Sequence, residues 1–190
     1  MKNDYSVMII SASRKFDNVF YEAVSDVSFG QVEILGSMDE AIRRMAEKKF
    51  DILIINAPVS GPSGIKVAQA VCNEGSTGVM FLTDERHYNE VNEAITPYGA
   101  LVVKKPLSMD LLKHSIMFLC GTCDRIRRME NKARKAEEKV DELKIINRAK
   151  WRLIDTRKMT EKEAHRFIEK QAMDRCVTKK IVAEEIMCIR

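Results

Sequence analysis

The side chains best suited to chemistry are the lysines and arginines of the last fifty residues. Such cations bind nucleic-acid phosphates, which gives an affinity that depends on salt more than on base sequence. Unpaired bases are recognised by stacking and by hydrogen bonds to their edges, so the only tryptophan, Trp151, is a further candidate. The basic candidates for such contacts are Arg148, Lys150, Arg152, Arg157, Lys158, Lys162, Arg166, Lys170 and Arg175.

Charge is distributed unevenly along the 190 residues, whose formal net charge is +4. Residues 121–190 hold 20 Lys/Arg against 13 Asp/Glu, whereas residues 1–120 hold 12 against 15. A basic second half after a mildly acidic first half favours an output domain that binds a polyanion. Basic residues that merely solvate helix faces produce similar counts, so the charge does not decide alone.

Apolar spacing predicts three short helices in the tail. Thr160 and Glu163 have capping-box spacing at the start of the second helix, and Thr178 is a cap for the third. The expected inner faces are Leu143, Ile146, Ala149, Leu153 and Ile154 in the first helix, Ala164, Phe167, Ile168, Ala172 and Met173 in the second, and Ile181, Val182, Ile186 and Ile189 in the third.

Several pieces of the tail occur in a characteristic order: the pair Ala149-Lys150, the run from Met159 to Ala164, the triplet from Ala172 to Asp174, and a short apolar third helix. Together they resemble the ANTAR domain of AmiR/NasR-type transcription antitermination regulators, a small three-helix RNA-binding module. The resemblance covers residues 143–190, implies binding to hairpins of nascent leader mRNA, and adds Ala149 and Thr160 to the candidate contacts. The family usually has glycine after Ala-Lys, so it stays open whether Trp151 packs or stacks on a base.

Short apolar runs alternate with amphipathic stretches in the first 120 residues, as expected for a doubly wound α/β fold with five parallel strands. The predicted strands are residues 5–10, 31–35, 51–55, 78–82 and 100–103. The intervening helices include residues 38–48 and 63–72.

This region, residues 1–120, resembles the flavodoxin-like receiver domain of two-component response regulators. The residues that carry the resemblance are the run from Asp51 to Gly64, Thr83, and the pair Lys105-Pro106. Two departures change the expected chemistry. The family's phosphoacceptor aspartate falls on Asn56, and its acidic pair falls on Ser11 and Ala12.

Phosphoryl transfer needs a carboxylate nucleophile and carboxylates that hold Mg²⁺, and neither Asn56 nor the pair Ser11 and Ala12 supplies them. Asp51 is not a substitute acceptor, because it opens its strand. We therefore interpret the region as a pseudo-receiver whose degenerate site also includes Thr83 and Lys105. A regulatory protein or a small ligand acting on the receiver stays open as the input.

A long helix is predicted after Gly121, because residues 122–150 contain neither proline nor glycine. Residues 121–142 form the expected coiled-coil linker and homodimer contact, assisted by the receiver, although a single helix packed on its own receiver is the alternative. Gly121 is a candidate bend. The heptad positions are Ile126, Met129, Ala133, Ala136, Val140, Leu143 and Asn147.

Other chemistries find little support in the sequence. The five cysteines form an odd set without a secretion signal, and Cys120 and Cys123 lack a second pair for a metal site. No apolar run is long enough for a membrane span, and no phosphate-binding glycine loop or nucleophile–base arrangement is present. We expect no enzyme activity, metal, cofactor or membrane, and a cytoplasmic location.

The predicted function is transcription antitermination by binding leader-mRNA hairpins, independently of receiver phosphorylation. The alternative is a dimeric signalling adaptor, or a DNA-binding response regulator, that acts through protein–protein contacts.

Overall fold

The computed structural model describes residues 5–25, 29–61 and 63–188. The chain consists of two compact units, Met1–Arg128 and Met129–Arg190. Each unit is described by itself below. The finer division into residues 1–120, 121–142 and 143–190 stays a prediction.

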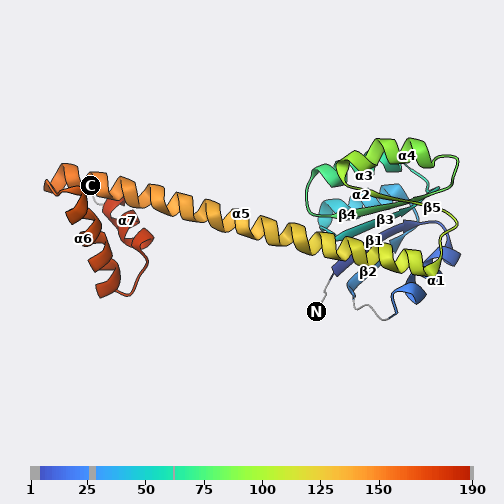
Figure 1. The fold of residues 1–190 in the computed structure, drawn as a ribbon, viewed down its shortest axis with the longest axis horizontal. Helices are drawn as coiled ribbons and strands as arrows, with labels where there is room; N and C mark the ends of the chain where they lie inside the picture. The colour runs from blue at the N-terminus through green and yellow to red at the C-terminus, as the bar shows by residue number, and fades with distance from the viewer. Residues whose placement is uncertain (1–4, 26–28, 62, 189–190) are drawn as a thin grey trace. The chain divides into compact units, whose positions relative to one another are not determined.

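The first unit is built on a parallel five-stranded sheet with the order β2-β1-β3-β4-β5, which confirms the predicted receiver-like fold (Figure 1). The central strand β3 is buried throughout, because helices cover both faces of the sheet. The strands are β1 (Tyr5–Ser11), β2 (Phe29–Leu35), β3 (Ile52–Asn56), β4 (Gly78–Thr83) and β5 (Leu101–Lys104).

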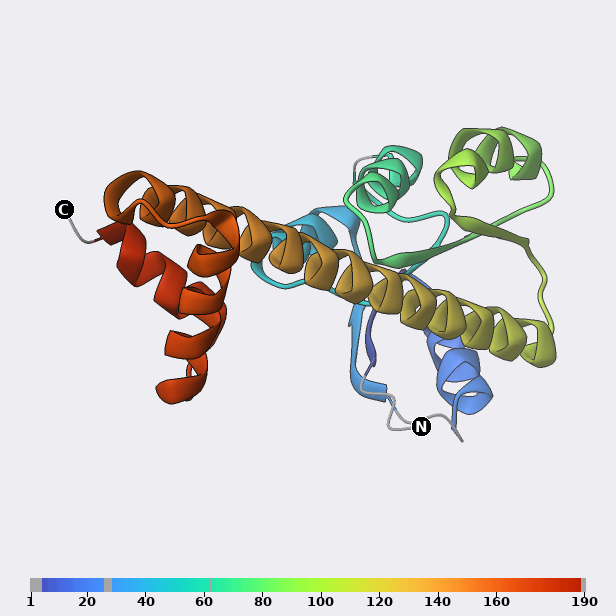
Figure 2. The same cartoon turned by 60° about the vertical axis from the view of Figure 1, so that its left-hand side comes forward.

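Helices cover the two faces of this sheet in separate groups. Apolar residues of α1 and of the first part of α5 pack on one face, and those of α2, α3 and α4 pack on the other. Figure 2 shows the ribbons of α1 and α5 on one side of the sheet and those of α3 and α4 on the other. The helices are α1 (Arg14–Ala23), α2 (Met38–Glu47), α3 (Gly64–Asn73), α4 (Tyr88–Ile95), the short 3₁₀ helix η1 (Thr96–Tyr98) and α5 (Met109–Arg157).

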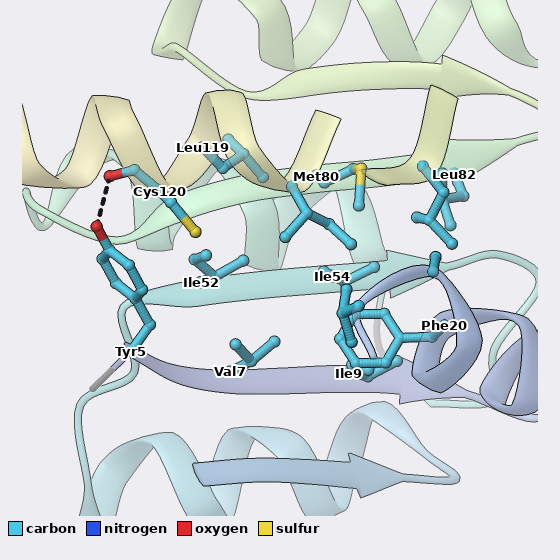
Figure 3. Close-up of a cluster of buried hydrophobic side chains, with 14 of the residues drawn as sticks. Tyr5, Val7, Ile9, Phe20, Ile52, Ile54, Met80, Leu82, Leu119 and Cys120 are labelled. Atoms are coloured by element: carbon cyan, nitrogen blue, oxygen red, sulfur yellow. Dashed lines mark hydrogen bonds between the residues drawn. The ribbon is translucent and has the colours of Figure 1, made fainter. Parts of the chain in front are cut away.

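The core between the sheet and α5 explains why Gly121 does not interrupt the helix. Cys120 and Cys123 are both buried in this core, and the hydroxyl of Tyr5 donates a hydrogen bond to the carbonyl of Cys120 at 3.2 Å (Figure 3). These contacts hold α5 on both sides of Gly121, and the helix continues through this residue, while the bend expected there stays a prediction. Burial also raises the pKa of the Cys120 thiol to about 12, which disfavours its reactive thiolate form.

The second unit contains the end of α5 with α6 (Glu161–Asp174) and α7 (Lys179–Cys188), the three helices that the sequence predicts (Figure 1). Its core confirms most of the expected inner faces. The buried residues are Ile146, Ala149, Leu153, Ala164, Ile168, Ala172, Val182, Ala183 and Ile186.

Three residues predicted for this core are exposed instead, namely Leu143, Met173 and Ile181. Leu143 lies one turn before the first buried residue of the module, Ile146, and Met173 lies in the last turn of α6. Helices this short need only a narrow buried stripe, so apolar residues at its margins stay in solvent. The prediction for Ile189 lies outside the described residues.

Candidate functional site

Three of the predicted RNA contacts meet at one depression of the second unit. A hollow of about 420 Å³ between α5 and α6 is lined by Lys150, Lys162 and Arg166. Its remaining lining residues are Glu161, His165 and Glu169. The helix hairpin brings the three cations together, although Lys150 and Lys162 belong to different helices. The hollow is therefore a mixed, cation-bearing surface suited to phosphate contacts.

Lys150 is held in a defined position at this hollow. Its Nζ atom donates a hydrogen bond to Oε1 of Glu161 at 3.0 Å, and only 15% of its side chain is exposed. Sequence reasoning missed Glu161, because a pair between two helices has no local signal. Any anion placed at Lys150 would therefore compete with the carboxylate of Glu161.

Trp151 lies on the outside of the module. Its exposed fraction is 69%, so the ring does not pack into the core of this module. An indole ring in solvent offers an unobstructed face to another aromatic system. The stacking of Trp151 on a base stays a prediction.

Two candidates taken from the family motif have structural tasks. Ala149 is fully buried in the core of the module, so the prediction that it contacts RNA is wrong. Thr160 caps α6: its hydroxyl accepts a hydrogen bond from the Glu163 N–H at 3.4 Å, and the Glu163 carboxylate accepts one from the Thr160 N–H at 2.8 Å. The predicted capping box is confirmed, and the hydrogen bonds that the Thr160 N–H and hydroxyl donate to the carboxylate hold the pKa of Glu163 below its usual value.

The remaining basic candidates form two groups, one with hydrogen bonds to other residues of the module and one with exposed side chains. The Nη1 atom of Arg152 donates to the carbonyl of Met187 at 3.2 Å, and Arg175 makes two hydrogen bonds to Glu185 at 2.5 and 2.6 Å. Arg175 therefore ties α6 to α7. The exposed group comprises Arg148, Arg157, Lys158 and Lys170, of which Arg157 lies over the ring of Phe167.

The receiver candidates meet at the carboxyl edge of the sheet, where strand register aligns Ser11 with Asn56. The side-chain amide of Asn56 donates to Oγ of Ser11 at 3.2 Å, and its oxygen accepts a hydrogen bond from Nζ of Lys105 at 3.2 Å. Lys105 also donates to the carbonyl of Ala57. Thr83, at the end of β4, is buried, whereas Ala12 is exposed.

These residues do not fit a Mg²⁺ site. Ser11, Ala12 and Asn56 carry no carboxylate, and the amide oxygen of Asn56 already accepts from Lys105. Across residues 5–25, 29–61 and 63–188, no group of three or more His, Cys, Asp or Glu residues could hold a metal ion. Within the same ranges no helix is long and apolar enough to cross a membrane.

The comparisons with known proteins agree with both parts of the fold. Residues 134–187 match the model of the ANTAR domain family. The chain is similar in structure to the signal receiver domain of an HD domain-containing protein from Pseudomonas fluorescens Pf-5, with TM-score 0.59, 13% identity, and coverage of 67% of this chain and 95% of that chain. It is also similar to the adenylate cyclase from Rhodopirellula baltica, with TM-score 0.61, 18% identity, and coverage of 70% and 98%. At these identities both likenesses show the fold alone.

A receiver-like domain followed by an ANTAR domain is the organisation of an ANTAR response regulator, and the findings support that class for this chain. Among curated proteins, the chain is similar to the transcriptional regulatory protein PdtaR of Mycobacterium tuberculosis. The two are 26% identical over 167 residues, which cover 88% of this chain and 78% of the relative. These findings also support a family of transcription antitermination regulators.

Proposed function

We propose that the protein binds hairpins in nascent leader mRNA and prevents formation of a transcription terminator. The observation that carries the proposal is the ANTAR domain itself, which combines the cation-lined hollow around Lys150 with the exposed ring of Trp151. Cations supply phosphate contacts, and an exposed aromatic ring supplies stacking on an unpaired loop base. The site of action is the cytoplasm, where nascent bacterial transcripts are made.

The mechanism is competition between two folds of one transcript. Free energy gained on binding stabilises the antiterminator hairpins, so the overlapping terminator hairpin does not form and the polymerase continues. The protein breaks and forms no covalent bond in this scheme. Its contribution is the difference in affinity between the two RNA folds, since a binder shifts an equilibrium only by its differential affinity.

The receiver acts without phosphorylation in this proposal. Asn56 stands where the family has its phosphoacceptor, and an amide does not accept a phosphoryl group as a carboxylate does. Lys105 and Ser11 are both hydrogen-bonded to Asn56, so residues without a carboxylate stand where the family has its phosphorylation site. Incubation with acetyl phosphate and Mg²⁺ should leave the mass of the protein unchanged, whereas a stable phosphoryl adduct on this unit would refute independence from phosphorylation.

A homodimer presents two ANTAR domains to paired hairpins, which raises the effective concentration of the second domain once the first has bound. The proposed contact is the exposed apolar face of α5, where Met129 is 63% exposed, Val140 50% and Leu143 53%. Ala133, Ala136 and Asn147 lie at the other heptad positions and are also exposed, while Ile126 is half-buried. Such a face is unfavourable in water and is covered when two copies associate.

Sequencing of RNA cross-linked to the protein in its native cells tests the proposal. We expect enrichment of leader regions in which paired hairpins overlap a terminator. Single-round transcription through an enriched leader should then show more read-through when the purified protein is added. Enrichment of genomic DNA, or co-purification of a protein partner without RNA, would favour the DNA-binding or adaptor alternative and contradict the proposal.

A further inference from the structure

The first unit has an open cleft of about 610 Å³ at the carboxyl edge of its sheet, in the size range of small-molecule sites. Its walls are formed by residues 12–19 after β1, by residues 56–58 at the end of β3, and by residues 105–107 after β5. Doubly wound parallel sheets bind ligands where the strand order reverses, and in this sheet that point lies between β1 and β3. The cleft therefore occupies the position where this topology places ligands.

Most of the lining is apolar. Phe16 belongs to the core cluster between the sheet and α5, and Val19 and Leu107 pack against that cluster. Ala12, Ala57, Pro58 and Pro106 complete the apolar lining. The floor of the cleft is thus continuous with the hydrophobic core, and a hydrocarbon group placed there would be removed from water.

The charged side chains that line the cleft are positive. Lys15 and Lys105 line the cleft, and no carboxylate does among the described residues. The ammonium group of Lys105 has three N–H bonds and donates to Asn56 and to the carbonyl of Ala57, so one donor remains. Burial lowers the pKa of Lys105, opposed by the charge of nearby Asp84. A ligand anion beside Lys105 would offset that cost of burying the cation.

We propose that the cleft binds a small amphipathic carboxylate, whose head group accepts a hydrogen bond from Lys105 while its hydrocarbon part lies against Phe16 and Leu107. The site would be the input of the pseudo-receiver. A carboxylate fits better than a phosphate, because it has fewer oxygens to satisfy, and Lys105 with its one remaining donor and Lys15 are the only cationic side chains among the described lining residues. The inference rests on the proposed loss of receiver phosphorylation.

The cleft is placed to act on α5. Leu107 precedes the first residue of this helix, Met109, by two positions, and Oγ of Ser108 accepts a hydrogen bond from the N–H of Leu111 at 3.2 Å. Further along the helix, Leu112 belongs to the same core cluster as Phe16. A ligand that displaces Leu107 therefore changes contacts at the beginning of the helix that continues into the ANTAR domain.

Nuclear magnetic resonance of the full chain tests this inference, with hexanoate and benzoate as probes and with hexanamide and inorganic phosphate as comparators. We expect the carboxylates to shift the amide signals of Ala12, Ala57 and Leu107. The neutral amide should bind about tenfold more weakly, because it lacks the charge that strengthens a hydrogen bond to an ammonium group. Absence of shifts with both carboxylates, or equal binding of hexanamide or phosphate, would overturn the inference.

Substitutions locate the binding. Lys105→Met removes the cation and Ala12→Phe fills the cleft from an exposed position, so each should weaken hexanoate binding about tenfold or more. Lys66→Met, an exposed position on α3, is the matched control and should bind normally. If Ala12→Phe retains its signal dispersion and full hexanoate binding, the cleft is not the site. Failure of the proposed function would be seen in other experiments. The protein would then acquire a phosphoryl group, or the unmodified chain would not bind hairpin RNA.

Discussion

Arg127 of α5 forms an ion pair with Asp51, the residue immediately before β3. The other carboxylate oxygen of Asp51 accepts hydrogen bonds from the N–H of Ser6 at 2.7 Å and from its hydroxyl at 2.9 Å. The guanidinium of Arg127 also lies 5.5 Å from the centre of the Tyr5 ring. One carboxylate therefore joins β1, β3 and α5 at the end of the sheet opposite to the cleft, and it attaches the helix to the first unit as far as Arg127.

Acid should weaken this attachment. Burial alone raises the pKa of Asp51, but the hydrogen bonds from Ser6 and Arg127 outweigh it and hold the pKa below its usual value. A carboxyl of this kind stabilises the fold above its unfolded pKa of about 3.9, and the contribution is lost as pH falls through the lower, folded pKa. We expect the urea concentration at the midpoint of unfolding to decrease as the pH is lowered through this range. The nuclear magnetic resonance signal of Ile54 follows the unfolding of the sheet.

Asp51→Asn should lower the free energy of unfolding by about 1–2 kcal/mol at pH 7, a value already reduced for the partial exposure of Arg127. The stability of this variant should also depend less on pH in the acidic range. Glu74→Gln, at an exposed position, is the control. An Asp51→Asn protein with the stability and acid profile of the unmodified chain would show that the ion pair contributes nothing.

Substitutions of the paired residues Lys150 and Glu161 should change the affinity for hairpin RNA in opposite directions. Lys150→Ala should weaken binding to hairpin RNA about tenfold and lower the salt dependence by about one phosphate contact. Glu161→Gln should strengthen binding, because it releases Lys150 and removes a negative charge from the hollow. Filter binding at several salt concentrations measures both effects, with Lys66→Ala as the control. Unchanged affinity in both variants would place the RNA elsewhere.

Trp151 is an intrinsic reporter, since it is the only tryptophan of the chain. Its exposed ring predicts that Trp151→Ala changes the stability of the module by less than about 0.5 kcal/mol. Stacking on a loop base predicts a loss of about 1–3 kcal/mol in RNA affinity and quenching of the fluorescence on binding. Trp151→Phe should keep part of the affinity. A fluorescence spectrum that hairpin RNA leaves unaltered would exclude stacking.

The exposed face of α5 predicts how dimerisation is broken. Val140→Glu places a charge at the centre of the proposed contact in both copies, so the dissociation constant of the dimer should rise at least about a hundredfold. Lys135→Glu, at an outward heptad position on the same helix, should dimerise normally. Sedimentation of the full chain distinguishes these results. A Val140→Glu protein that still dimerises would move the contact to another surface.

Local patterns in the sequence predict most of the fold, because alternating apolar runs and caps depend on neighbours along the chain. The capping box of Thr160 and Glu163 is such a case, with its two members three residues apart. The pair of Asp51 and Arg127, 76 positions apart, has no signal in the sequence, because no local pattern links the start of β3 to α5.

The candidate RNA surface was predictable by residue type but not by arrangement. Sequence identifies Lys150 as a cation, yet its partner Glu161 depends on how α6 folds back on α5. The motif also selected Ala149, whose side chain fills the core, because a motif does not separate packing residues from contact residues. The exposure of Met173 likewise follows from the width of the packed stripe rather than from hydrophobicity.

The most direct measurement of the central claim is the affinity of the full chain for an RNA with two adjacent hairpins, compared with the same sequence as DNA and with an unstructured RNA of equal length. The account predicts that the hairpin RNA binds at least about tenfold more tightly than both comparators at moderate salt. Equal affinity for all three nucleic acids, or no binding at low ionic strength by a confirmed dimer, would contradict it.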